Sequence, residues 1–470
     1  MLIPHKGVSR KKNSECVNDD GIGRNPREQS KSSNYLLRAR KGETSVEKIL
    51  DKILSNVNLN LAYQRVYQNR GIGGVDEMDV FALKGYLREN GEEIKELIHK
   101  RKFKPQPVMR VEIPKDNGGV RLLGIPTVVD RVIQQAIHQV LSPIVEEQFH
   151  ENSYGFRPNR NGEQAIVKSL ELLNEGYEWV VDNDLERFFD TVHHDKLMRL
   201  ISNTIADGDV ISLIRKYLVS GVMSDGKYAA TPEGTPQGGP LSPLLRNIML
   251  NELDKELKAR GLNFVRYADD ALIFTKSAKA AERVMNSVSC FIIDKLGILV
   301  NVQKSRVSRP MKLKFLGFGF YKDVSSQKWQ SRPHPESVRK FQRKIKKLTK
   351  RNWSRSLDMR IKKLNQLIKG WVNYYKIAKI KSALTRIDEK LRFRIRMIIW
   401  KQWKVPKKQI ASLVKLGIPI EEAKGLTWCR KGYNYIAHSK VVHRALSNNR
   451  LKQRGIPSAL EHYLTVHTVI

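Results

Sequence analysis

Leu262-Asn263-Phe264-Val265-Arg266-Tyr267-Ala268-Asp269-Asp270-Ala271-Leu272-Ile273-Phe274 sets two adjacent carboxylates between two apolar runs. The pattern predicts a strand, a tight turn and a second strand, with Asp269 and Asp270 at the turn. Two acids at a hairpin tip repel each other, and divalent cations bound there would relieve that repulsion. For the four letters Tyr-Ala-Asp-Asp alone, an ordinary surface turn is the simpler interpretation, so the rest of the chain has to decide.

The positive charge of the chain is concentrated near its C-terminus. Of 470 residues, 85 are Lys or Arg and 48 are Asp or Glu, which gives a net charge of +37. Residues 311–470 carry 39 basic and 8 acidic side chains, a net +31. Such a basic third indicates a polyanionic partner, most simply nucleic acid. An anionic membrane surface is the competing interpretation, and the domain-like length of the basic region and its interspersed aromatic residues weigh against it.

The cysteines and the apolar runs bear on the cellular setting. Cys16, Cys290 and Cys429 lie far apart, without a CxxC pair, so neither a zinc ribbon nor a disulfide framework is expected. A reducing, intracellular setting fits this pattern. No apolar run approaches the roughly 20 residues that span a bilayer, and the N-terminus lacks the apolar core of a signal peptide. We therefore expect a cytoplasmic protein without a membrane partner.

Apolar periodicity and turn residues predict a mixture of helices and strands, followed by a helical C-terminal region. Expected helices begin at about residue 45 and cover 78–101, 129–148, 195–220, 241–260 and 278–296, and expected strands cover 108–113, 120–124, 178–184, 262–274 and 313–321. From about Pro335 onward nearly all of the chain is expected to be helical and basic. The predicted fold class is α+β with an all-helical C-terminal extension.

A third carboxylate ends the apolar strand predicted at 178–184. Asp184 follows Val180-Val181-Asp182-Asn183 and precedes Leu185-Glu186-Arg187-Phe188-Phe189-Asp190. If this strand pairs with the 262–274 hairpin, Asp184, Asp269 and Asp270 form a three-carboxylate site. Hard oxygen ligands suit two Mg²⁺ ions, with Mn²⁺ as an alternative, and polymerases use such a pair. Asp182 and Asp190 are interpreted as structural neighbours rather than ligands.

Seven sequence blocks occur in one order along the chain. They are Arg110-Val111-Glu112-Ile113-Pro114-Lys115, Arg121-Leu122-Leu123-Gly124-Ile125-Pro126-Thr127, Ser153-Tyr154-Gly155-Phe156-Arg157-Pro158, Asp184-Leu185-Glu186-Arg187-Phe188-Phe189-Asp190, Gly234-Thr235-Pro236-Gln237-Gly238-Gly239, Tyr267-Ala268-Asp269-Asp270 and Leu316-Gly317-Phe318. In this order and spacing they resemble the group II intron-encoded reverse transcriptases, which also act as maturases, and within them the class of bacterial group IIC introns. The resemblance runs from about residue 45 to the C-terminus.

The resemblance implies contacts to the incoming dNTP. Lys115 and Arg121, on either side of a predicted hairpin turn, would hold the triphosphate, although both could also be ordinary solvated cations. Phe189 would pack under the sugar and exclude a 2′-hydroxyl, the alternative being core packing, which one of Phe188 and Phe189 is expected to do. Gln237, in a loop whose small residues would let the backbone approach the templating base pair, would contact that pair. Lys304 matches a family lysine near the leaving pyrophosphate.

Further cations are candidate nucleic-acid contacts. Arg157 and Arg160 lie with aromatic residues on a predicted loop, a combination that suits single-stranded template. In the basic third, apolar residues recur at helical spacing while cations face elsewhere, which predicts helices that pack on one face and contact phosphates with the other. The candidates there are Lys362, Lys363, Lys369, Arg392, Arg394, Arg396, Lys401 and Lys404. A merely solvated charged face is the alternative.

The resemblance implies the fold of a right-hand polymerase. The expected divisions are a flexible basic arm over 1–44, an N-terminal extension and fingers over 45–175, a palm over 176–320, a helical thumb with the maturase region over 321–390, and a basic DNA- and RNA-binding domain over 391–470. The implied partners are group II intron RNA, an RNA template with a DNA primer, target DNA and dNTPs in the bacterial cytoplasm.

The implied function is RNA-directed DNA synthesis, together with binding of the intron RNA as a splicing maturase and support of intron mobility by target-primed reverse transcription. Many family members end in an HNH-type endonuclease with paired cysteines and histidines. That signature is missing here, so we expect no DNA cleavage by the protein. The alternative is a domesticated or defence-associated reverse transcriptase, of the kind tied to retrons or CRISPR loci.

Overall fold

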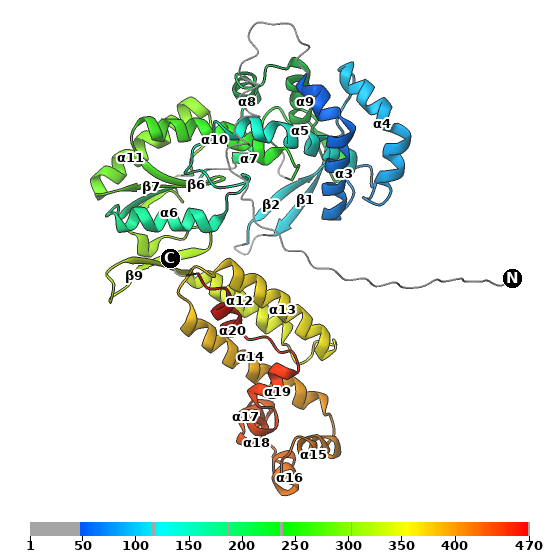
Figure 1. The fold of residues 1–470 in the computed structure, drawn as a ribbon, viewed down its shortest axis with the longest axis vertical. Coiled ribbons are helices and arrows are strands. Elements are labelled where there is room, and N and C mark those ends of the chain that lie inside the picture. Colours follow the sequence, from blue (N-terminus) through cyan, green and yellow to red (C-terminus); the bar gives the residue numbers. More distant parts are fainter. Residues whose placement is uncertain (1–47, 115–117, 186–187, 236–237, 302, 469–470) are drawn as a thin grey trace, which may run out of the picture. The chain divides into compact units, whose positions relative to one another are not determined.

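A four-stranded antiparallel sheet carries the predicted hairpin (Figure 1). Its order is β6-β7-β3-β8, formed by β6 (Asn263–Tyr267), β7 (Asp270–Thr275), β3 (Trp179–Asn183) and β8 (Arg306–Ser308). The computed structural model describes residues 48–114, 118–185, 188–235, 238–301 and 303–468. The predicted arm over 1–44, together with Lys115 and Gln237, lies outside them.

Alternation along these strands divides the interior into two cores. Val180, Val265 and Leu272 belong to one buried cluster, whereas Val181 and Ile273 belong to the other. Successive strand residues point to opposite faces, so a continuously apolar strand can bury both faces of a sheet. The sheet is covered on one side by α6 (Gly162–Asn174) and on the other by α11 (Ala278–Phe291), as Figure 1 shows.

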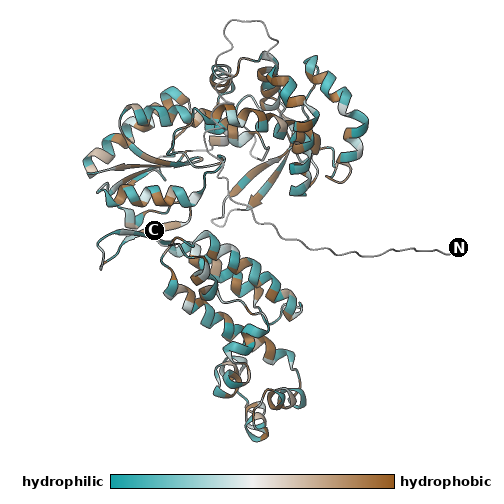
Figure 2. Cartoon of the chain, viewed as in Figure 1, coloured by the Kyte–Doolittle hydropathy of each residue, from teal (hydrophilic) through white to brown (hydrophobic). Residues whose placement is uncertain are grey.

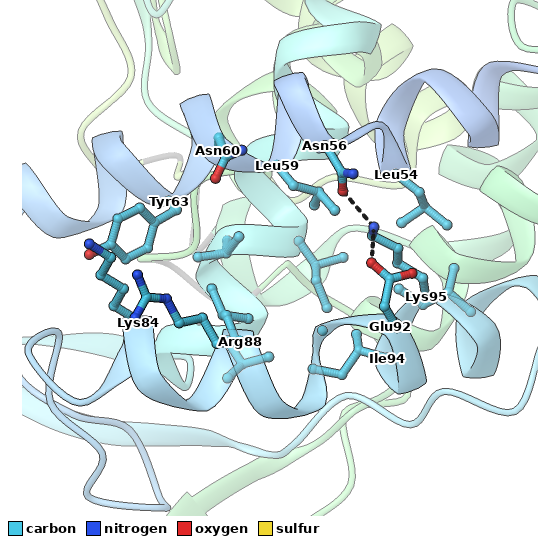
Figure 3. A pocket seen from close by; sticks show the side chains of 16 residues that line it. Leu54, Asn56, Leu59, Asn60, Tyr63, Lys84, Arg88, Glu92, Ile94 and Lys95 are labelled. Carbon is cyan, nitrogen blue, oxygen red and sulfur yellow. Dashed lines mark hydrogen bonds and ion pairs between the residues drawn. The ribbon is translucent and has the colours of Figure 1, made fainter.

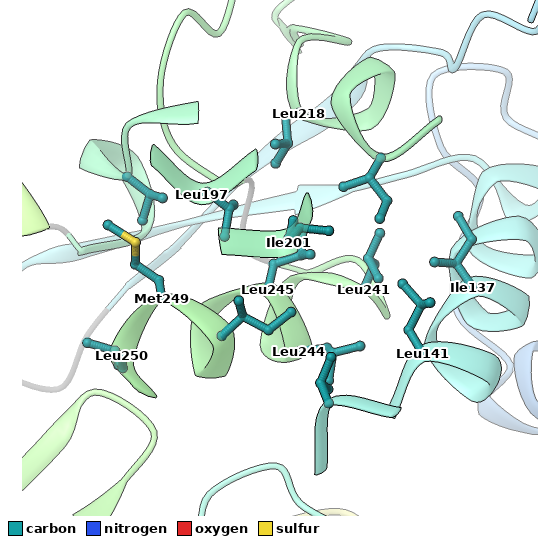
Figure 4. Close-up of a cluster of buried hydrophobic side chains, with 14 of the residues drawn as sticks. Ile137, Leu141, Leu197, Ile201, Leu218, Leu241, Leu244, Leu245, Met249 and Leu250 are labelled. Atoms are coloured by element: carbon teal, nitrogen blue, oxygen red, sulfur yellow. The ribbon is translucent and has the colours of Figure 1, made fainter. Parts of the chain in front are cut away.

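The core on the α11 side continues into a bundle of helices. Figure 4 shows leucine, isoleucine and methionine side chains converging there from α5 (Val128–Glu146), α8 (His194–Ser202) and α10 (Ser242–Ala259). The remaining N-terminal helices are α2 (Ile49–Leu54), α3 (Asn56–Asn69), α4 (Leu83–His99), α7 (Phe188–Thr191) and α9 (Gly208–Leu218). A π-helix, η1 (Ile292–Leu296), follows α11, and a short 3₁₀ helix, η2 (Pro310–Lys312), follows β8.

A second four-stranded sheet and a two-stranded one complete the strands. The order β2-β1-β4-β5 joins β1 (Val108–Pro114), β2 (Val120–Ile125), β4 (Val222–Ser224) and β5 (Lys227–Ala229). β1 and β2 are antiparallel, so Pro114 lies opposite Val120 at the end of the predicted hairpin. The pair β9 (Phe318–Lys322) and β10 (Trp329–Pro333) precedes the helical region.

From Pro335 the described chain is helical, as predicted. The helices are α12 (Pro335–Leu348), α13 (Leu357–Tyr374), α14 (Lys381–Gln402), α15 (Pro406–Lys415), α16 (Ile420–Thr427), α17 (Tyr433–His438), α18 (Lys440–Ala445), α19 (Asn448–Gln453) and α20 (Ala459–Val466). Figure 2 shows hydrophilic and hydrophobic residues interleaved along them. In α13, Leu364 and Ile368 are buried, whereas Lys362 and Lys369 are exposed. None of the helices among the described residues is both long and apolar enough to cross a membrane.

The structure differs from the expected elements in several places. The helix expected over 195–220 is two helices, because Asp207 caps a new one by accepting hydrogen bonds from the amides of Asp209 and Val210. The strand expected over 313–321 begins only at Phe318, after a turn in which Leu316 has a φ of 50°. Helices α6 and α7 and strands β4, β5, β8 and β10 were not predicted.

The C-terminal helices are tied to this turn. The hydroxyl of Tyr374 donates to the carbonyl of Leu316 at 2.8 Å, and that of Tyr375 donates to the carbonyl of Gly317 at 3.3 Å. Gly317 has a φ of 79°, in the left-handed region that favours glycine. The predicted Leu316-Gly317-Phe318 block is therefore a docking point for α13.

Candidate active site

The two adjacent acids stand at a two-residue turn. Tyr267 and Asp270 are the last paired residues of β6 and β7, so Ala268 and Asp269 form the turn itself. Ala268 has a φ of 57°, where glycine is normally preferred at this turn position. A strained residue at this place requires support from its surroundings.

Arg266 supplies that support from inside the protein. Its side chain is fully buried and forms two hydrogen bonds with the equally buried Asp254 of α10, at 2.8 and 2.6 Å. Its Nη1 donates to the carbonyl of Ala268 and to Oδ1 of Asn247, both at 3.0 Å. These four hydrogen bonds satisfy most donors of a guanidinium that would be costly to bury unpaired. The network links the turn to α10.

The loop before α6 packs against the same turn. The amide of Arg266 donates to Asn152 and its carbonyl accepts from Tyr154. A Cβ atom at Gly155 would lie 2.3 Å from the amide nitrogen of Ala268, so no larger residue fits there without displacement. The carbonyl of Gly155 accepts a hydrogen bond of 2.8 Å from Asn247. Loop, turn and helix therefore form one hydrogen-bonded unit.

Asp184 reaches the same end of the sheet as the turn. Asn183 is paired with Ala271, so Asp184 follows directly beside the start of β7, where Asp270 lies. Its carbonyl accepts from the amide of Asn301 at 2.8 Å, and its amide donates to Ser305 Oγ at 3.1 Å. The predicted pairing of the two acidic segments is confirmed.

The acids share a strongly negative environment. Crowding by the surrounding protein and the charges of Asp269, Asp182 and Asp184 raise the pKa of Asp270 to about 7, against a smaller opposing effect of Lys314. Asp270 is nevertheless exposed to solvent, so its neighbouring carboxylates are the main constraint on its charge. Burial raises the pKa of Asp182, with Arg306 acting against it. Four carboxylates this close together repel one another, and a nearby positive charge is needed to offset that repulsion.

A cation already lies beside Asp184. Lys304 Nζ is 2.9 Å from Asp184 Oδ2, as an ion pair in which the lysine is two-thirds exposed. Among the residues that the structure describes, this same buried Oδ2 accepts no hydrogen bond of normal geometry. The contact is therefore an ion pair with a largely exposed lysine, of the kind that contributes little to stability.

The donor set fits a hard divalent cation. Within the described residues, no group of three or more acidic, histidine or cysteine side chains is arranged so that it could hold a metal ion. The chemistry of the donors is nevertheless suitable, because Asp184, Asp269 and Asp270 offer carboxylate oxygens, and burial together with the neighbouring carboxylates raises the pKa of Asp270. An open site of this kind leaves ligand positions for substrate phosphates and water.

Comparisons with known proteins decide the family. A model described as reverse transcriptase (RNA-dependent DNA polymerase) matches residues 113–320, and one described as group II intron, maturase-specific domain, matches residues 338–415. The chain is 34% identical over 272 residues to Protein YkfC of Escherichia coli (strain K12), covering 50% of this chain and 71% of that protein. The chain belongs to the family of group II intron-encoded reverse transcriptases and maturases.

Other relatives share part of the chain. Group II intron-encoded protein LtrA of Lactococcus lactis subsp. cremoris is 38% identical over 213 residues, which cover 45% of this chain but 35% of that protein. Among solved structures, a partial Cas6-RT-Cas1–Cas2 complex is similar at 23% identity and a TM-score of 0.34, covering 53% of this chain and 43% of that one. We draw no conclusion from a structural likeness of that size.

The dNTP residues predicted for this reverse transcriptase family are only partly described. Lys115, Gln237 and the side chain of Phe189 lie outside the described part of the chain. Phe188 is buried in the core, the role expected of one of the two phenylalanines. Arg121 is exposed on β2.

The glycines after Gln237 have a reason that the sequence did not suggest. A Cβ at Gly238 would lie 2.1 Å from the carbonyl oxygen of Gly124, and one at Gly239 would lie 2.3 Å from Oε1 of Gln134. Close packing of this loop on β2 and α5 therefore accounts for both small residues, without any nucleic acid.

Three of the arginines predicted to contact nucleic acid are paired with protein groups in the structure. Arg157 is buried and bonds to Glu146 at 2.8 Å and to the carbonyls of His150 and Ser153. Arg396 is buried and donates to the carbonyl of Leu446 at 3.0 Å.

Arg394 is half-buried and caps the end of α12 through the carbonyls of Lys346 and Thr349, at 3.2 and 3.1 Å. Unpaired carbonyls at a helix end attract such donors. All three arginines thus satisfy protein groups, and a count of cations in the sequence cannot distinguish these arginines from surface ones.

The other predicted contacts have mixed surroundings. Arg392 is half-buried beside Asp388, at 3.7 Å, and Arg160 is half-buried with its guanidinium over the ring of Tyr154. The remaining candidates are exposed to solvent: Lys362, Lys363, Lys369, Lys401 and Lys404. They remain predictions.

A cleft of about 350 Å³ opens between α3, α4 and α5, separate from the acid site (Figure 3). Leu59, Ile94 and Ile133 supply apolar lining, and Lys95 bridges Asn56 and Glu92 at 2.6 and 2.7 Å. None of its lining residues belongs to the sheet that carries the acids. We therefore assign it no part in the chemistry.

Proposed function

We propose that the protein is an RNA-directed DNA polymerase that extends a DNA primer along an RNA template with dNTPs. The observation that carries the proposal is the meeting of Asp184 with Asp269 and Asp270 at one end of the β6-β7-β3-β8 sheet. Mg²⁺ bound there, with Mn²⁺ as a substitute, would activate the primer 3′-hydroxyl and neutralise charge on the phosphates.

The residues of the chain have distinct parts in this proposal. Asp184, Asp269 and Asp270 would hold the cations, and Arg266 with Asp254 keeps the turn in place. Lys304 pairs with Asp184, and its proposed contact with the leaving pyrophosphate rests on its sequence block. Arg121, Lys115, Phe189 and Gln237 are proposed to hold the dNTP on the strength of their sequence blocks.

We further propose that the protein binds its own group II intron RNA as a maturase. The exposed lysines of α13 support this role, because they share a helix whose opposite face is buried, and α13 lies within the matched maturase-specific region. That region also favours an intron-encoded protein over a retron- or CRISPR-associated one. We also propose that the protein belongs to the group IIC class, supports intron mobility into target DNA and acts in the bacterial cytoplasm. Its domains are proposed to divide at residues 175, 320 and 390.

The two activities make separable demands on the protein. Asp269→Asn removes one charge from the acid site and leaves the lysines of α13 unchanged. The variant should still promote splicing of intron RNA at low Mg²⁺, while failing to extend a primer. Loss of both activities in a folded variant would contradict the division of labour between the carboxylates and the basic surface.

A further inference from the structure

Phe156 is exposed next to the turn of Ala268 and Asp269, which is called the acid turn below. Its side chain is 56% exposed, although it is a large apolar residue, and its backbone has a φ of 56°. The preceding residue is Gly155, which packs so closely on Ala268 that a Cβ would lie 2.3 Å from its amide nitrogen. Consecutive Cα atoms are about 3.8 Å apart, so Phe156 begins within one residue of the turn.

Both neighbours of Phe156 are anchored. Gly155 accepts a hydrogen bond from the buried side chain of Asn247 at 2.8 Å. Arg157 is 8% exposed and bonds through Nε and Nη2 to Glu146, at 3.0 and 2.8 Å. A guanidinium paired in this way with a carboxylate holds a loop in one geometry. The loop therefore keeps one large side chain outside while its neighbours are fixed inside.

The exposed ring and the left-handed backbone of Phe156 occur together. A single exposed apolar residue is ordinary on a protein surface and by itself means little. A left-handed backbone at a phenylalanine is unfavourable, however, and such strain concentrates where a side chain has to be held in place for a ligand. Here the strain, the two anchors and the contact with the acid turn occur in three consecutive residues.

We propose that Phe156 packs against the base or sugar of the nucleic acid that ends at the acid site. The inference rests on the proposed polymerase function and adds a residue that binds the template–primer. Every nucleotide has an apolar face, so an aromatic ring contacts it without regard to sequence. Arg157 was expected to contact the template, but it is paired with Glu146. In this proposal the contact of the loop with nucleic acid is made by Phe156.

The test uses the full-length protein and a labelled RNA–DNA template–primer. Phe156→Ala should weaken its binding, measured by fluorescence anisotropy, by about 5- to 100-fold, the range that loss of one aromatic stacking contact produces. Phe156→Trp should restore most of the affinity. Phe81→Ala is the matched control, because Phe81 is 63% exposed but packs on Tyr67, and it should bind as the wild type does.

Phe156→Gly separates a binding role from a structural one. Glycine relieves the left-handed backbone, so this variant should unfold at a temperature equal to or above that of the wild type while still binding weakly. Wild-type affinity in Phe156→Ala, or a lower unfolding temperature in Phe156→Gly, would overturn the proposal. A wild-type protein that binds the template–primer but does not extend it would instead contradict the polymerase function.

Discussion

Arg266 donates a hydrogen bond of 3.0 Å to the carbonyl of Ala268, the residue that opens the turn before the two acids. The arginine lies on β6, the strand that leads into the turn, and its buried side chain fixes the turn by this hydrogen bond. Asp254 compensates its charge in the interior. The geometry of the candidate metal ligands thus depends on an ion pair that does not touch the metal site.

The buried ion pair predicts a separation of stability from activity. Arg266→Met leaves Asp254 buried without a counter-charge and should lower the free energy of unfolding by about 3–5 kcal/mol. The double variant Arg266→Met/Asp254→Leu should recover most of that loss, because no lone charge remains. Primer extension should stay low in the double variant, since Ala268 still lacks its donor. Chemical denaturation and extension assays check both parts, and full activity in the double variant would contradict the positioning role.

Gly155 predicts a steric effect on the turn. Gly155→Ala forces its Cβ against the amide of Ala268, which should reduce the rate of primer extension by at least about tenfold and destabilise the fold by about 1–3 kcal/mol. Gly85→Ala is the control, because a Cβ at Gly85 meets nothing within 4 Å. That helical position should gain up to about 1 kcal/mol and keep its activity. Equal effects of the two changes would argue against a special contact at the turn.

The cations of the basic third, residues 311–470, fall into two classes: those exposed to solvent and those paired with protein groups. Changing Lys362, Lys363 and Lys369 together to Gln should lower the slope of log K against log salt by about 2–3, one unit for each lost phosphate contact, without unfolding the protein. Arg396→Ala should instead lower the free energy of unfolding by about 1–3 kcal/mol, because the carbonyl of Leu446 loses its donor. Salt titrations of RNA binding and denaturation curves distinguish the two. A changed salt slope in a folded Arg396 variant would reassign that arginine to the surface.

Asp130 predicts a pH dependence that is unrelated to the acid site. Burial raises its pKa to about 6, opposed by hydrogen bonds from Thr127, Gln106 and Tyr217. A carboxyl with a raised folded pKa contributes most stability below its unfolded pKa near 3.8, and that contribution is lost as the pH rises through about 6.

The free energy of unfolding of the wild type, relative to Asp130→Asn, should therefore fall between about pH 4 and 6, by up to about 3 kcal/mol. Thermal or urea unfolding of both proteins across that range measures the difference. A difference that is constant with pH would contradict the raised pKa.

The sequence predicted the strands of the acid site well because their pattern is local. The run before Tyr267 and the run after Asp270 are apolar and short, and the hairpin of β6 and β7 joins residues that are neighbours in the sequence. The order of the sheet and the parallel pair of β1 and β4 could not be predicted, because they depend on contacts between distant segments.

The supporting residues were harder to find. Arg266 carries a charge inside an apolar strand and Asp254 stands on the buried face of α10, and each is a detectable signal of a partner. Their pairing, however, requires the fold. The same limit applies to Arg157, Arg394 and Arg396, whose burial follows from neighbours far away in the sequence. Composition alone therefore overestimates the cations that are available to nucleic acid.

Primer extension on an RNA template by the Asp184→Asn and Asp269→Asn variants tests the central claim most directly. Both variants should remain folded and bind the template–primer, because each change replaces a carboxylate by an amide of the same shape. We predict that neither extends the primer at any Mg²⁺ concentration at which the wild type is active. Extension by either variant at a rate close to that of the wild type would contradict the assignment of these acids as the catalytic centre.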